Sequence, residues 1–175
     1  MIDLNLVFPE IFISLGLMFL LLFGVFKKNS SMIIYNSSII FLIITLALIL
    51  NHPLEQETLL FNNSYRIDYL SSFMKLLTVA SAIFVMIASK KYIQLIKIFK
   101  IEYPILLLSS ILGMLVMISS NDLIVFYMGL ELQSLALYVL ASFNRDNLLS
   151  SESGVKYFVL SALSSGLLLY GCSLI

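Results

Sequence analysis

The chain has 175 residues, of which 61% are hydrophobic and only 11% are charged, and its formal net charge is zero. Soluble domains carry about twice that charged fraction, and a mean hydropathy of +1.05 leaves too little polar surface for a protein that folds in water. The composition therefore predicts an integral membrane protein. It also gives the chain as a whole no basic surface suited to nucleic acid.

Six apolar segments follow one another along the chain, each within the range of about 17–25 residues that a transmembrane helix needs. We expect six helices over residues 7–26, 32–50, 67–89, 103–119, 123–141 and 155–175. Strands of a membrane barrel would be about ten residues long and would alternate strictly, which this pattern does not do. The sequence predicts one all-α transmembrane domain, with a polar loop over 51–66, a basic connector over 90–102 and a polar loop over 142–154.

The loops between these segments differ in charge. One side of the membrane receives most of the basic residues: Lys27, Lys28, Lys90, Lys91, Lys97, Lys100 and Arg145, with Lys156 at its margin. The other side receives Arg66 and most of the acidic residues. Because basic residues accumulate in loops on the inner side, we expect the N-terminus on the outer side. The short turn at Asn121 and Asp122 makes the fourth and fifth helices antiparallel neighbours.

The residue inventory excludes several kinds of site within this chain. Cys172 is the single cysteine and His52 the single histidine. No internal disulfide can form, and no haem, iron–sulfur or zinc site can be assembled from this chain alone. We therefore expect no metal and no cofactor bound by this chain. The N-terminal residues resemble neither a secretory signal nor a transit peptide, so we expect the first apolar segment to be retained.

Glu131 is the first candidate functional residue. It lies ten residues after Asn121, about 15 Å along a helix, which places it near the bilayer midplane. Further polar side chains share its helical face and lead toward the basic end: Tyr127, Ser134, Tyr138, Ser142 and Arg145. Intramembrane acids are costly and usually functional, so we expect Glu131 to handle protons, with Tyr127 as a further candidate. The alternative is a structural acid that a basic residue on another helix neutralises.

Two lysines are further candidates. Lys75 lies about eight residues inside the third segment, too deep to reach the outer surface easily, so it must face protein, water or an acid. It could pair with Glu131, or it could serve as a counter-ion for a neighbouring subunit. Lys156 follows Glu152 by four residues, an arrangement that forms ion pairs on helices. That pair either anchors the sixth helix at the interface or marks a proton entrance.

The residues around Glu131 are specific enough to indicate a family. The run "SSNDLIVFYMGLELQSLALYVLASFNRD" and the following residues to 175 closely resemble subunit 2 of the proton-pumping NADH:quinone oxidoreductases, respiratory complex I. The segments "PEIFISLGLMFLLLFG" and "FMKLLTVASA" fit the same family less distinctively. The resemblance implies an antiporter-like, non-redox subunit without a complete active site, which moves protons when electron transfer elsewhere drives it. FMN, iron–sulfur clusters and ubiquinone would then lie elsewhere in the complex.

The resemblance also carries expectations about site and partners. Glu131 matches the family's key acid on the fifth helix, whose partner is a lysine on the seventh helix. Such subunits have about fourteen helices, whereas this sequence ends near the sixth. We therefore expect a split subunit, in which a second polypeptide supplies the remaining helices. Other membrane-arm subunits and membrane lipids would be its further partners.

The sequence leaves alternatives for both the cellular compartment and the function. The residue usage and the absence of a transit peptide favour the mitochondrial inner membrane, with the bacterial plasma membrane as the alternative. Two other functions compete with proton translocation in complex I. The chain could be a purely structural scaffold of the membrane arm, or a subunit of a stand-alone cation/proton antiporter.

Overall fold

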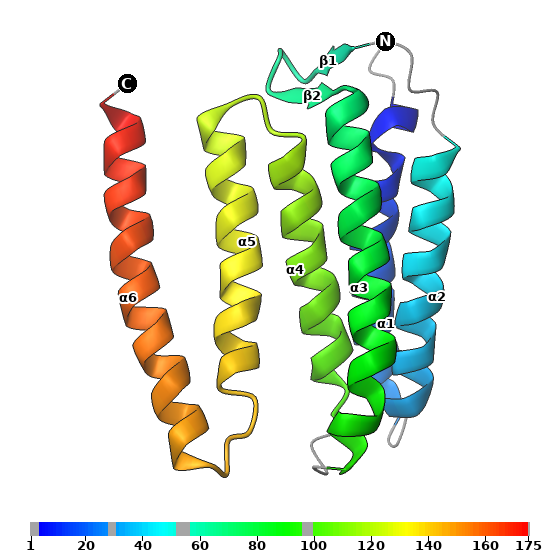
Figure 1. The fold of residues 1–175 in the computed structure, drawn as a ribbon, viewed down its shortest axis with the longest axis vertical. Helices are drawn as coiled ribbons and strands as arrows, with labels where there is room; N and C mark the ends of the chain where they lie inside the picture. The colour runs from blue at the N-terminus through cyan, green and yellow to red at the C-terminus, as the bar shows by residue number, and fades with distance from the viewer. Residues whose placement is uncertain (1–3, 28–30, 52–56, 96–99, 175) are drawn as a thin grey trace.

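The computed structural model describes residues 4–27, 31–51, 57–95 and 100–174, which form a bundle of upright helices (Figure 1). A short 3-10 helix, η1 (Leu4–Val7), precedes the bundle, and a two-stranded antiparallel sheet joins the second and third helices. The α-helices are α1 (Phe8–Phe26), α2 (Ser31–Leu50), α3 (Tyr69–Leu95), α4 (Glu102–Ile118), α5 (Leu123–Ala141) and α6 (Leu148–Ser173). The strands are β1 (Thr58–Leu60) and β2 (Tyr65–Ile67).

The helices have the length and composition of membrane spans. Five of the described helices are long and apolar enough to cross a membrane, and α4 is a shorter apolar helix. With 17 residues, α4 is about 26 Å long and still lies within the range of known spans. The predicted class, an all-α membrane protein, is confirmed.

Three predicted boundaries are wrong. α3 continues through Lys90 and Lys91 to Leu95, so helix replaces the first part of the expected basic connector. α6 begins at Leu148, inside the expected loop, because the side chain of Asn147 caps it and accepts a bond from Leu149 N at 3.0 Å. Polar residues can continue a helix whose first turn is capped in this way. The expected polar loop over 51–66 instead contains the hairpin β1–β2.

α1 to α4 enclose the apolar core. The fully or almost fully buried side chains come from all four helices: Ile13, Leu20, Ile34, Leu42, Val79, Met86, Leu108 and Leu115. α4 and α5 approach more closely, through Gly113 and Gly129. A Cβ on Gly113 would lie 2.6 Å from the backbone nitrogen of Gln133. Such small residues let membrane helices bring their backbones together, and they confirm α4 and α5 as neighbours.

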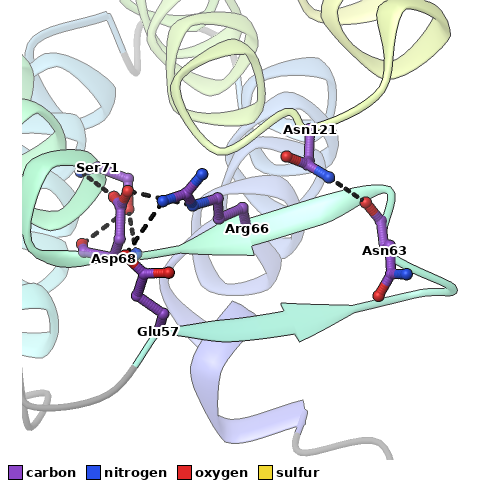
Figure 2. A network of polar contacts seen from close by, with 6 residues as sticks. All are labelled: Glu57, Asn63, Arg66, Asp68, Ser71 and Asn121. Atoms are coloured by element: carbon purple, nitrogen blue, oxygen red, sulfur yellow. Dashed lines mark hydrogen bonds and ion pairs between the residues drawn. The ribbon is translucent and has the colours of Figure 1, made fainter.

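The hairpin covers one end of the bundle and is fastened to the α4–α5 turn. Asn121 N donates to Ser64 O at 3.0 Å, and Asn121 Nδ2 donates to Asn63 O at 2.7 Å (Figure 2). Arg66 N donates to Ser119 O at 2.8 Å. These bonds hold β2 beside the end of α4. Tyr65, which lies in β2, is thereby turned into the bundle and is 6% exposed.

A second polar network joins β2 to the start of α3 (Figure 2). Asp68 caps α3: its Oδ1 accepts from Ser71 N at 2.7 Å, and its own N donates to Ser71 Oγ at 2.9 Å. This reciprocal arrangement is a capping box with serine at its third position. Arg66 contacts both Asp68 and Glu57, at 3.3 and 3.1 Å. The Ser71 N–H, and secondarily Arg66, hold the pKa of Asp68 below its usual value.

α6 stands at the edge of the bundle and contacts α5 near its first half. Gly154 packs against Ser142, and Tyr138 contacts the rings of Tyr157 and Phe158. Figure 1 shows α6 diverging from α5 toward its C-terminal end. Gly154 is the one described residue of α6 that is buried. Most side chains of this helix are therefore exposed among the described residues.

Candidate functional site

Glu131 lies near the middle of α5, as the sequence predicted, and is half-buried. Its Oε1 atom is buried and has no hydrogen-bond partner among the described residues. Ser134 Oγ donates to the backbone oxygen of Glu131 at 3.1 Å and leaves the carboxylate unaided. Buried polar atoms are almost always satisfied, so the Glu131 carboxylate needs water, a proton or a donor beyond the part of the chain described here.

The other side chains of the predicted polar face have separate roles. Tyr138 is buried, and its hydroxyl donates to Ser161 Oγ of α6. Ser142 Oγ donates back to Tyr138 O at 3.2 Å, so it is engaged with its own helix. Tyr127 lies one turn before Glu131 and is half-buried. These hydrogen bonds connect α5 to α6 or stay within α5, and none of them reaches the Glu131 carboxylate.

The basic end of this face opens on a large cavity. Its volume is about 610 Å³, and its walls come from α1, α4, α5, α6 and the α5–α6 loop. Ser142 and Arg145 line it together with Lys100 and Glu102, while most other lining residues are apolar. The predicted stripe therefore ends at a hollow with charged residues along its border.

Lys75 has a different partner from the one considered in the sequence. Its Nζ lies 2.6 Å from Glu10 Oε1, and both residues are 4% exposed. The acid that faces Lys75 is therefore on α1 and not on α5, so pairing with Glu131 is wrong for this structure. Glu10 lies in the first turn of α1, a position typical of a residue at the membrane surface.

Tyr65 completes this cluster. Its hydroxyl donates to Glu10 Oε1 at 2.8 Å and accepts from Lys75 Nζ at 3.1 Å. Burial, and then the adjacent Glu10 carboxylate, raise the pKa of Tyr65, so the phenol keeps its proton and remains a donor. Sequence reasoning missed both Glu10 and Tyr65. Their signal is weak, because no pattern along the chain shows that α1, β2 and α3 meet at this point.

Lys156 forms the pair with Glu152 that its spacing predicted. The Nζ and Oε1 atoms are 2.5 Å apart, and the side chains are 70% and 57% exposed. Exposed pairs of this kind contribute little to stability. A role for Lys156 in proton entry stays a prediction.

Known proteins match this chain both in sequence and in fold. The family described as NADH:quinone oxidoreductase/Mrp antiporter, transmembrane, matches residues 120–175, which contain α5, Glu131 and α6. In the solved structure of respiratory complex I from Thermus thermophilus with bound aureothin, one chain matches with a TM-score of 0.76. That match covers 93% of this chain and 35% of the other at 24% identity, so it shows a shared fold.

Curated relatives match along almost the whole sequence. NADH-quinone oxidoreductase subunit N of Pelagibacter ubique is 68% identical over 99% of this chain and 37% of that protein. The subunit N proteins of Maricaulis maris and Bartonella bacilliformis are 47% and 49% identical, each over 99% of this chain and 36% and 35% of their own lengths. The chain thus spans little more than a third of these relatives. Over almost its whole length it is similar to the N-terminal part of NADH-quinone oxidoreductase subunit N proteins.

Proposed function

We propose that this chain forms the N-terminal helices of an antiporter-like membrane-arm subunit in a proton-pumping NADH:quinone oxidoreductase. It contributes part of a proton path that electron transfer elsewhere in the complex drives. The identity of 68% to a subunit N protein over almost the whole chain supports the assignment. The observation that carries the proton path is the buried, unpartnered Oε1 of Glu131 in the middle of α5.

The chemistry required of Glu131 fits this function. An ionised carboxylate accepts hydrogen bonds only, and a protonated one also donates. Its Oε1 is therefore satisfied by a water, a proton or a cation, and a proton path brings each of these to the site. Tyr127 is the hydroxyl one turn away that could share a proton with it. Lys156, an exposed residue in the first half of α6, is the corresponding candidate for a proton entrance.

We further propose that additional helices of such a subunit cover α6. The exposed faces of α6 support this, since Gly154 is its one buried residue among those described. The resemblance places the cationic partner of Glu131 on a seventh helix, outside these residues. The redox groups, FMN, iron–sulfur clusters and quinone, would then be held by other subunits, with this chain binding none of them.

The proposed orientation puts the hairpin end on the outer side of the membrane. The hairpin and the α4–α5 turn lie at one end of the bundle and the α5–α6 loop at the other (Figure 1), which agrees with the charge of the loops. The relatives from Pelagibacter, Maricaulis and Bartonella favour a bacterial plasma membrane. The mitochondrial inner membrane remains the competing location.

Glu131→Gln in the assembled complex tests the proton function. Glutamine keeps the shape of the side chain and removes its ability to carry a proton. In membrane vesicles we expect NADH oxidation to be measurable while the protons moved per NADH, followed with a pH-sensitive dye, fall clearly. Glu57→Gln, at an acid that is 71% exposed, is the matched control and should leave pumping unchanged.

The same assay separates the competing functions. Unchanged pumping by an assembled Glu131→Gln complex would make the chain a scaffold. Cation-dependent proton flux without NADH oxidation would make it a stand-alone antiporter.

A further inference from the structure

Glu10, Tyr65 and Lys75 form a buried ionisable cluster at the hairpin end of the bundle, separate from Glu131. The three side chains are 4%, 6% and 4% exposed. Lys75 Nζ and the Tyr65 hydroxyl both bind Glu10 Oε1, at 2.6 and 2.8 Å. Both contacts to the carboxylate therefore fall on the same oxygen, Oε1.

The other carboxylate oxygen of Glu10 is buried without a hydrogen bond among the described residues. Ser119 lies beside Tyr65, because its backbone oxygen accepts from Arg66 N at 2.8 Å. Buried polar atoms left without protein partners are typically satisfied by ordered water. Glu10 Oε2 is therefore an acceptor that a water can satisfy.

A hollow lined by both polar and apolar residues lies near the cluster. It has a volume of about 320 Å³ and lies between the start of α3 and the α4–α5 turn. Arg66, Ser71 and Ser120 are among its lining residues. Ser71 is one helical turn from Lys75, while Arg66 and Ser120 adjoin Tyr65 and Ser119 in the chain. Since a water occupies about 30 Å³ in the liquid, the hollow can hold several.

We propose that Glu10, Tyr65 and Lys75 form a second proton-exchange site of this chain, which communicates with the hairpin side of the membrane through water in this hollow. The proposal rests on the proton-translocating function proposed above. It adds three residues and a location to that function. Glu131 would handle protons in the middle of α5, and the cluster would handle them near the hairpin end of α1 and α3.

The chemistry is a proton transfer within an ion pair. While Lys75 and Glu10 are in contact, each charge compensates the burial of the other. If their contact lengthens, burial disfavours both charges, and a proton passes from the Lys75 ammonium to the Glu10 carboxylate. The pair becomes an amine and a carboxylic acid without a change in net charge. Release of the acid's proton to water at Oε2 and reprotonation of the amine complete one transfer.

The decisive variant is the double substitution Glu10→Gln and Lys75→Met in the assembled complex. It removes both charges together, so neither is left buried and uncompensated. We expect the complex to assemble and oxidise NADH but to move fewer protons per NADH. A complex that pumps at the wild-type stoichiometry would overturn the proposal and leave the pair a purely structural contact. Glu57→Gln is the control at the same end of the molecule and should pump normally.

If the double variant does not assemble, Tyr65→Phe and an infrared measurement test the proposal instead. Tyr65→Phe retains the ring and removes the hydroxyl, so it should assemble and lower the protons moved per NADH; unchanged pumping contradicts the proposal. In the reconstituted wild type, the phenol C–O–H band that Tyr65→Phe abolishes should shift within minutes of transfer to D₂O, because water that reaches the cluster exchanges the hydroxyl hydrogen. A band insensitive to D₂O overturns the water-accessible site.

Comparison with Glu131→Gln separates the two proposals. If Glu131→Gln lowers pumping while the cluster variants do not, the cluster proposal fails and the proposed function stands. If neither Glu131→Gln nor the cluster variants affect pumping, both fail.

Discussion

Breaking the buried pair at one end only should destabilise the protein far more than removing both partners. Lys75→Met leaves the Glu10 carboxylate buried with the Tyr65 hydroxyl as its remaining neighbour. Glu10→Gln leaves the Lys75 ammonium buried without a counter-charge. The double variant leaves no buried charge in the cluster.

The size of the effect follows from the geometry. At 2.6 Å and an effective dielectric constant of about 20, the gross attraction is about 6 kcal/mol, much of which offsets the desolvation of the two ions. Loss of one partner of a fully buried pair costs about 3–5 kcal/mol. That corresponds to more than about a hundredfold in the folding equilibrium. The double variant should lose much less than the sum of the two single variants.

Unfolding of the purified protein in detergent micelles, followed by circular dichroism, measures each term of this double-mutant cycle. We expect each single variant to lose about 3 kcal/mol or more and the double variant to recover most of that loss. Additive losses within about 0.5 kcal/mol would refute the reasoning. Such a result would mean that water or lipid headgroups already reach the two charges.

Three other substitutions and one control follow from the packing, the capping and a surface ion pair. Gly113→Ala should cost about 1–3 kcal/mol, because its Cβ would lie 2.6 Å from a backbone nitrogen of α5, whereas Gly166→Ala, which meets nothing within 4 Å, should be tolerated in the same unfolding assay. Asp68→Ala should cost about 1 kcal/mol at neutral pH by removing the cap on Ser71. The pKa of Asp68 is lowered in the folded protein, so its contribution to stability is fully present above the ordinary carboxyl pKa of about 3.9 and is lost as pH falls through the lower folded-state value. The difference in unfolding free energy between Asp68→Ala and the wild type should therefore become smaller in acid. Lys156→Gln, at an exposed ion pair, should change stability by less than about 0.5 kcal/mol.

The class of the protein and its main candidate residue could be predicted from the sequence. Apolar runs of helix length leave few alternatives to membrane spans, because a backbone in lipid must satisfy its own hydrogen bonds. An acid in the middle of such a run stands out by its cost, which is why Glu131 was found without a structure. Lys75 was found for the same reason. The inferences about Glu131 and Lys75 each require only the residues of one apolar segment and the cost of placing a charge in lipid.

Element boundaries were harder to predict where polar residues extend helices or form short strands. The expected start of α6 was late because hydropathy does not register the cap that Asn147 places on Leu149. The hairpin was missed because Asn62 and Asn63 are residues typical of loops. Both have the left-handed backbone conformation that asparagine tolerates, with φ of 55° and 70°. In both places a few hydrogen bonds, rather than periodicity, determine the structure.

The partners of the buried charges were decided by the tertiary structure alone. Glu10 stands far from Lys75 in the chain and looked like a residue of the membrane surface. The packing of α1 against α2 and α4, and the hairpin bound to the α4–α5 turn, bring Glu10 and Tyr65 to Lys75. The sequence by itself determines that a lysine at this depth needs a partner, because the cost of a charge in lipid depends on its own segment. Which acid meets that need depends on contacts between distant segments, which only the folded bundle specifies.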